Sequence, residues 1–111
     1  MNVLFVCSRN RLRSPTAEAV FAGIDGLSVA SAGTSPDAEE PVTEELVAWA
    51  DLILVMEGRH KRLLNRTFGR ALRDKRLVVL GIPDDYDYLD PELVALLHER
   101  AGPHLARRID R

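Results

Sequence analysis

The chain has 111 residues, of which 46% are hydrophobic and 29% charged, as is ordinary for a soluble globular protein. Its formal net charge of -2 gives no overall attraction to nucleic acid or to an anionic membrane. The single cysteine, Cys7, cannot form an internal disulfide or complete a zinc site alone. No stretch approaches the ~18 apolar residues of a membrane helix, and the N-terminal apolar run is too short for a signal peptide. We therefore expect a single cytoplasmic domain over residues 1–111.

Four short apolar runs predict buried strands, because they are continuous rather than alternating, as in a parallel sheet covered on both faces. The predicted strands are residues 2–6, 27–31, 52–56 and 77–80. The predicted helices are residues 16–22, a segment that begins after Thr43, residues 58–73 and residues 91–101. Gly102-Pro103 is predicted to interrupt the fourth helix, which resumes at residues 105–109. Strands that alternate with helices indicate an α/β domain with right-handed crossovers.

Some residue types mark helix ends or helix faces. Ser14 is predicted to cap the first helix, with Pro15 at its first position. Residues 58–73 place apolar side chains on one face and arginines on the opposite one, which we interpret as a solvated face rather than a nucleic-acid site. The three histidines have no metal-ligand spacing with the cysteine, and we expect no functional role for them: His60, His98 and His104.

Residues 7–15 directly follow the first predicted strand, and ligands of parallel sheets bind beyond the carboxyl ends of strands. Backbone N–H groups in a tight loop and a helix N-terminus together attract anions. We expect the positive potential of the N–H groups and of the helix N-terminus to favour a nucleophilic thiolate at Cys7. Arg13 can bind two oxygens of a phosphoryl group with its planar guanidinium. A lone cysteine is more often a small buried hydrophobe, but the position of Cys7 between a strand and a helix favours a phosphate site.

Four segments resemble the low-molecular-weight protein tyrosine phosphatase family, in order along the chain. Residues 6–18 are similar to its Cys-X5-Arg-Ser-Pro signature, and residues 31–34 to its Ser-Ala-Gly-Thr segment. Residues 51–56 are similar to its third strand, and residues 82–86 to its Asp-Pro-Tyr loop. The resemblance implies a three-layer fold with a four-stranded parallel sheet of order 2-1-3-4. It also implies a phosphatase that uses no metal and no organic cofactor.

The resemblance further implies roles for the residues of the first loop. Cys7 would attack phosphorus and form a phosphocysteine, while Arg13 and the amides of residues 8–13 stabilise the phosphoryl oxygens. Ser14 would donate a hydrogen bond to the sulfur, and Ser31 would support the loop. A phosphate or sulfate ion is expected in this loop. The residues expected to contact the substrate are Ser8, Arg9, Asn10, Arg11, Leu12, Ser14 and Tyr86.

An acidic loop after the fourth predicted strand can supply the proton that the leaving oxygen needs. Aligning residues 83–86 on the family's Pro-Asp-Pro-Tyr places this general acid at Asp84, which would then act as a base on water. Asp85 stands where the family has proline, so an ambiguity of one residue remains. Asp90 precedes Pro91 and is predicted to cap a helix instead.

Two departures from the family concern the substrate. The segment of residues 35–50 is short and lacks the family's aromatic wall, because Trp49 is predicted to pack in the core, although Tyr86 and Tyr88 could form a wall from the other side. Arg9 and Arg11 replace smaller uncharged residues, which favours strongly anionic substrates and disfavours phosphoarginine.

Protein phosphotyrosine is the leading predicted substrate, and a small phosphate ester is an alternative. Two other functions remain open at this point. One is an arsenate reductase that uses an external thiol, since the same loop binds arsenate. The other is a non-catalytic module that binds phosphate or a phosphoprotein. No nucleic acid and no membrane are expected as partners.

Overall fold

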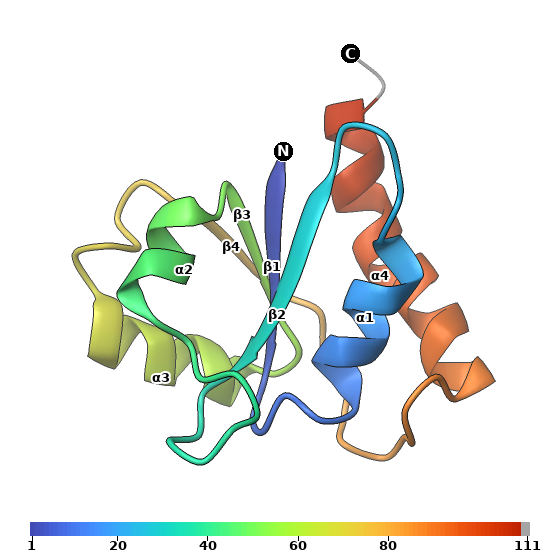
Figure 1. Cartoon of the computed structure of the whole chain (residues 1–111), viewed down its shortest axis with the longest axis horizontal. Coiled ribbons are helices and arrows are strands. Elements are labelled where there is room, and N and C mark those ends of the chain that lie inside the picture. Colours follow the sequence, from blue (N-terminus) through green and yellow to red (C-terminus); the bar gives the residue numbers. More distant parts are fainter. Residues whose placement is uncertain (110–111) are drawn as a thin grey trace.

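The computed structural model describes the backbone of residues 1–109 and the side chains of residues 1–105. Strands and helices alternate along the chain (Figure 1). The elements are β1 (Asn2–Cys7), α1 (Arg13–Phe21), β2 (Ser28–Gly33), α2 (Glu44–Trp49), β3 (Leu52–Val55), α3 (Gly58–Phe68), β4 (Arg76–Val79) and α4 (Pro91–Ile109).

The strands form a parallel sheet of order β2-β1-β3-β4, which confirms the predicted α/β fold and strand order. Helices α1 and α4 cover one face of the sheet and α2 and α3 cover the other (Figure 1). Side chains of β1 alternate between two core clusters, with Val3 and Phe5 in one and Leu4 and Val6 in the other. The central strand is therefore buried on both faces, and its carboxyl end at Cys7 is held rigidly.

The first helix begins earlier than predicted. Its N-cap is Leu12, which makes no side-chain capping bond, so the prediction that Ser14 caps this helix was wrong. Ser14 lies inside the first turn, and its hydroxyl contacts Cys7 Sγ instead. Thr43 does cap α2, since its Oγ1 accepts a hydrogen bond from the backbone N–H of Leu46 at 3.1 Å.

The later helices also differ from the prediction. Helix α3 ends at Phe68 rather than residue 73, because Gly69 follows and the chain continues in turns. Helix α4 runs through Pro103 without the predicted break. Leu97, Ala101 and Leu105 are buried on both sides of that proline, and this packing keeps the segment helical. Within residues 1–109, no helix is both long and apolar enough to cross a membrane.

Candidate active site

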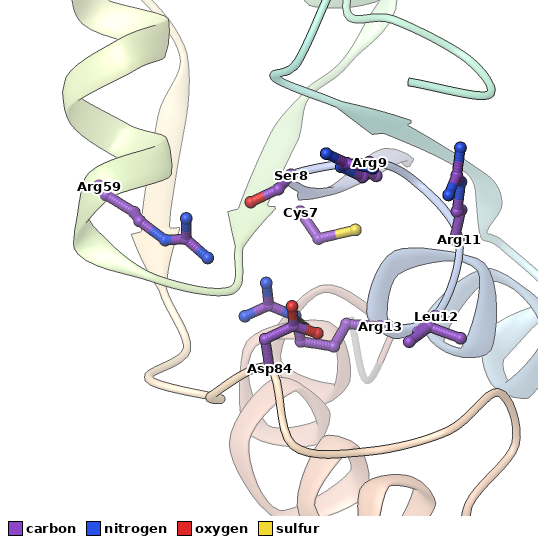
Figure 2. Close-up of a pocket in the computed structure, with 8 residues that line it drawn as sticks. All are labelled: Cys7, Ser8, Arg9, Arg11, Leu12, Arg13, Arg59 and Asp84. Atoms are coloured by element: carbon purple, nitrogen blue, oxygen red, sulfur yellow. Dashed lines mark ion pairs between the residues drawn. The ribbon is translucent and has the colours of Figure 1, made fainter. Parts of the chain in front are cut away.

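The loop between β1 and α1 forms the floor of a hollow of about 340 Å³ at the carboxyl edge of the sheet (Figure 2). Side chains from three parts of the chain meet here: the loop itself, the first turn of α3, and the acidic loop after β4. The lining residues are Cys7, Ser8, Arg9, Arg11, Leu12, Arg13, Arg59 and Asp84.

A second loop, at residues 34–39, fixes how the first one turns. The carbonyls of Cys7, Ser8 and Arg9 accept hydrogen bonds of 2.9, 2.9 and 3.0 Å from backbone N–H groups of this second loop. In a trans peptide the C=O and N–H groups point in opposite directions. The N–H groups that follow these carbonyls are therefore directed away from the second loop, as an anion-binding loop requires.

The two loops approach each other at Gly33, the last residue of β2. A Cβ atom placed there would lie 2.5 Å from the carbonyl oxygen of Ser8 and 2.7 Å from the Cβ of Ala38. Real Cβ atoms essentially never lie this close to a non-bonded atom, so the approach of the two loops requires glycine here. Gly33 lies in the segment at residues 31–34 that the sequence analysis singled out.

A chain of hydrogen bonds behind the loop leads to the sulfur. Glu18 Oε1 accepts from the hydroxyl of Ser31 at 2.5 Å. The side-chain amide of Asn10 donates to the hydroxyl oxygens of both Ser31 and Ser14 at 2.9 Å. Ser14 Oγ lies 2.9 Å from Cys7 Sγ and also donates to the carbonyl oxygen of Ala32 at 3.4 Å. A thiolate at Cys7 has no hydrogen to donate, so the Ser14 hydroxyl would then be the donor to the sulfur. Asn10 has the left-handed φ of 57°, which lets the loop curl around the hollow.

Arg13 is almost fully buried, with 2% of its side chain exposed. Its Nη1 donates to Glu57 Oε1 at 2.5 Å and to the carbonyl oxygen of Ile82 at 2.8 Å. Its Nε lies 3.6 Å from Asp84 Oδ1. Among the described residues, none accepts a hydrogen bond from Nη2 of Arg13. This nitrogen can therefore donate to an oxygen of a bound ligand.

Glu57 and His60 support the site, and neither was predicted from the sequence. Burial raises the pKa of Glu57, but hydrogen bonds from Arg13 and Arg59 and their charges outweigh this effect, so the pKa lies below its ordinary value. Glu57 is therefore an anion that balances the buried guanidinium of Arg13. The signal available in the sequence was a carboxylate directly after the third strand, at the same sheet edge as Cys7.

His60 contradicts the expectation that no histidine has a role. Its Nδ1 accepts the backbone N–H of Glu57 at 3.0 Å, so its proton lies on Nε2, 2.9 Å from the hydroxyl of Ser8. Burial, followed by the charges of Arg13 and Arg59, lowers the pKa of His60 to about 4. The imidazole is therefore neutral at pH 7 and ties α3 to the phosphate loop.

Several other residues that were singled out from the sequence do not line the hollow. Asn10 and Ser14 lie behind the loop, buried, and do not line the hollow. Tyr86 does not line it either, because it is partly buried against the core cluster. Trp49 packs against the other core cluster, as predicted, and Tyr88 is 50% exposed. No described aromatic residue lines the hollow.

The acidic loop presents one carboxylate to the hollow. Asp84 lines it, across from Cys7 and beside the guanidinium of Arg13 (Figure 2), whereas Asp85 does not. Asp84 is 56% exposed, so it meets both solvent and any ligand. Asp90 accepts the backbone N–H of Glu92 at 2.9 Å, which agrees with its predicted place at the start of α4.

Comparison with known proteins agrees with this arrangement. The sequence model of the family described as "Low molecular weight phosphotyrosine protein phosphatase" matches residues 2–49. A protein-arginine-phosphatase of Bacillus subtilis (strain 168) is 39% identical in an alignment that covers 68% of this chain and 67% of the relative.

Solved structures are similar as well. A cysteine-to-serine mutant of YwlE arginine phosphatase with a phosphorylated active-site serine has a TM-score of 0.73 and 30% identity, covering 100% of this chain and 97% of that one. Vibrio vulnificus Wzb in complex with benzylphosphonate has a TM-score of 0.78 and 24% identity, covering 96% and 97%. This chain belongs to the low-molecular-weight protein tyrosine phosphatase family, and it is a cysteine-dependent phosphatase.

Proposed function

We propose that this protein removes phosphate from protein side chains through a phosphocysteine intermediate on Cys7, and that phosphotyrosine is its preferred substrate. The observation that carries the proposal is the arrangement of the hollow: the sulfur lies on its floor, with Arg13 and Asp84 across from it. The phosphorylated active-site serine of the YwlE mutant supports transfer of phosphate to the residue at this position.

In the first step the Cys7 thiolate attacks phosphorus, and the bond between phosphorus and the ester oxygen breaks. Nη2 of Arg13 and the loop amides bind the equatorial oxygens, where charge is concentrated in the transition state. Asp84 gives its proton to the leaving oxygen, so that a neutral phenol departs rather than a phenolate.

In the second step a water molecule attacks phosphorus and the bond between phosphorus and sulfur breaks. Asp84, now a carboxylate, takes the proton of that water. The Ser14 hydroxyl, 2.9 Å from Cys7 Sγ, donates a hydrogen bond to the departing thiolate, which has no hydrogen of its own, while the amide of Asn10 holds the Ser14 oxygen. Inorganic phosphate is released and the enzyme returns to its starting state.

Charge favours the phenolic substrate over the cationic one. Three arginines line the hollow besides the buried Arg13, and Asp84 is the carboxylate that lines it among the described residues. The arginines repel the guanidinium of phosphoarginine, but they do not repel the uncharged ring of phosphotyrosine. Phosphoarginine is nevertheless the second candidate, because the relative with 39% identity is a protein-arginine-phosphatase.

Two peptides of one sequence, carrying either phosphotyrosine or phosphoarginine, separate these candidates. We expect a kcat/KM for phosphotyrosine at least about tenfold higher, which corresponds to ~1.4 kcal/mol. A higher value for phosphoarginine would reverse the assignment. Release of phosphate from neither peptide, nor from p-nitrophenyl phosphate, would contradict the proposal, and a parallel assay with arsenate and an external thiol would then test reductase activity.

Variants of the acidic loop test its role. Replacing Asp84 by Asn should lower kcat for the phosphotyrosine peptide by about 100-fold, because phenolate is a poor leaving group without a proton. The same variant should lose less on p-nitrophenyl phosphate, whose leaving group is more acidic. Asp85→Asn is the matched control, since Asp85 is exposed and does not line the hollow. An equal loss in Asp85→Asn would contradict the assignment of the acid to Asp84.

A further inference from the structure

Three exposed arginines extend from the hollow along α3, and we call them the basic ridge: Arg59, Arg62 and Arg66. Spacings of three and four residues place them on one side of the helix. Arg59 lines the hollow, and its guanidinium points toward the space above Arg13 and Asp84 (Figure 2). The ridge is therefore continuous with the site of phosphate transfer.

The ridge has little anionic compensation within the protein. Arg59 pairs with Glu57 at 2.9 Å, but Glu57 also balances the buried Arg13. Arg62 and Arg66 form no ion pair with any described residue. A positive strip thus remains on a chain whose formal net charge is -2.

The start of the ridge lies at the positive end of the helix dipole, where Glu57 at the N-cap offsets part of the charge, whereas Arg66 lies in the last turn, where a cation is favourable. Arg59 lies in the first turn of α3, a turn that contains no acidic residue. An Nη1 atom of Arg62 lies 3.5 Å from the position of a Cβ on Gly58, so this second guanidinium also reaches the N-terminal end. Cations at a helix N-terminus are unfavourable, and an anion bound there relieves this repulsion.

The loop after β4 has the opposite charge to the ridge, and of its carboxylates Asp84 lines the hollow, whose other charged lining residues are arginines. The loop after β4 exposes Asp84, Asp85 and Asp87. An extended substrate that runs from the ridge across the hollow to this loop therefore meets basic side chains on one side of its phosphorylated residue and the exposed carboxylates of the loop on the other. Such a surface distinguishes the two flanks of a phosphorylated segment.

We propose that the basic ridge binds acidic residues on one flank of the phosphorylated residue, so that the enzyme selects phosphoproteins with an acidic segment there. This inference rests on the proposed function. Arg59 and Arg66 are seven residues apart, which spans about 10 Å of helix. An extended peptide advances about 3.3 Å per residue, so the ridge covers about three residues beside the phosphorylated one. The other flank, facing the acidic loop, is neutral or basic in a preferred substrate.

Phosphotyrosine peptides that differ only in one flank test this inference. One flank would carry three glutamates, three glutamines or three lysines, placed in turn before and after the phosphotyrosine. We expect the glutamate flank to raise kcat/KM about tenfold over glutamine on one side only, as several exposed charge pairs together would give. The advantage should shrink in about 0.5 M salt, because salt screens exposed charges.

Charge removal on α3 shows whether the ridge causes this preference. In Arg59→Ala and in the double variant Arg62→Ala/Arg66→Ala, the ratio of kcat/KM for the glutamate peptide over the glutamine peptide should fall about threefold or more. Taking the ratio within each variant cancels any general loss of activity or folding. Lys61→Ala is the matched control, since Lys61 is exposed on the other side of α3 and its loss should leave the ratio unchanged.

Two results would overturn the inference: equal kcat/KM for all flanks in the unaltered protein, or an equal fall of the ratio in Lys61→Ala and in the ridge variants. Failure of the proposed function is distinguishable from both. In that case neither the glutamine peptide nor p-nitrophenyl phosphate would be hydrolysed, whereas a failed flank preference leaves both reactions intact.

Discussion

Glu57 Oε1 lies 2.5 Å from Nη1 of the buried Arg13, and this ion pair connects the start of α3 with the start of α1. The pair holds the guanidinium so that Nη2 remains available to a phosphoryl oxygen. Glu57 touches no part of the substrate in the proposed mechanism. It acts by positioning Arg13.

Removing the charge of Glu57 should therefore lower both the stability of the folded protein and its rate of turnover. In Glu57→Gln the buried guanidinium loses its counter-charge, and we expect the free energy of unfolding to fall by about 2 kcal/mol. The kcat/KM for phosphopeptides should fall about tenfold, with most of the loss in kcat. Urea unfolding and steady-state kinetics measure the two effects. Glu99→Gln is the control, because Glu99 and Arg100 form an exposed pair whose loss should change stability by less than about 0.5 kcal/mol.

Gly33→Ala tests the close approach of the two loops. A new Cβ would meet the Ser8 carbonyl and Ala38, so the phosphate loop must shift. We expect a loss of about 1–3 kcal/mol in the free energy of unfolding and a fall in kcat/KM. In the control Gly102→Ala the new Cβ meets nothing within 4 Å, and a gain of about 0.5–1 kcal/mol is expected in a helix. Unaltered activity in Gly33→Ala would show that the loop does not depend on this contact.

Two substitutions of Asn10 distinguish the loss of its hydrogen bonds from the strain of its left-handed backbone. Asn10→Gly and Asn10→Ala both remove the hydrogen bonds to Ser14 and Ser31, and both should slow release of the thiolate from phosphorus. Only the alanine variant must also hold a Cβ at a φ of 57°. We therefore expect Asn10→Ala to be about 1 kcal/mol less stable than Asn10→Gly in urea unfolding. Equal stability of the two variants would contradict the claim that a Cβ at this backbone conformation is strained.

The neutral His60 makes stability depend on pH. Its pKa is about 4 in the folded protein and 6.5 in the unfolded chain, so the unfolded chain binds more protons between these values. The free energy of unfolding should therefore fall as the pH drops from 6.5 to 4, by up to about 3 kcal/mol. Urea unfolding across this range measures the slope, and His60→Asn should flatten it. A slope that is the same in both proteins would contradict a buried neutral imidazole.

The apolar runs are local signals, and they predicted the strands and their alternation with helices, whereas the strand order was implied by the family resemblance. The position of Cys7 and Arg13 between a strand and a helix predicted a phosphate site, and the family resemblance added Asp84 to it as the general acid. The bond between His60 and Ser8 joins residues 52 positions apart, and no local pattern encodes such a contact. The arginines of α3 look solvated in sequence, and only the packing of α3 brings Arg59 to the hollow. Pro103 was misread because buried neighbours can maintain a helix that a proline weakens.

The central claim is that Cys7 carries the phosphoryl group during turnover. Asp84→Ala and p-nitrophenyl phosphate test it most directly: the acidic leaving group departs without a proton donor, whereas hydrolysis of the phosphocysteine lacks its base. Rapid acid quenching followed by peptide mass spectrometry should find the mass of one phosphoryl group on the peptide that contains Cys7. Cys7→Ala should neither turn over nor carry that mass. Release of p-nitrophenol by Asp84→Ala with no phosphoryl group on Cys7 at any quench time would contradict the account.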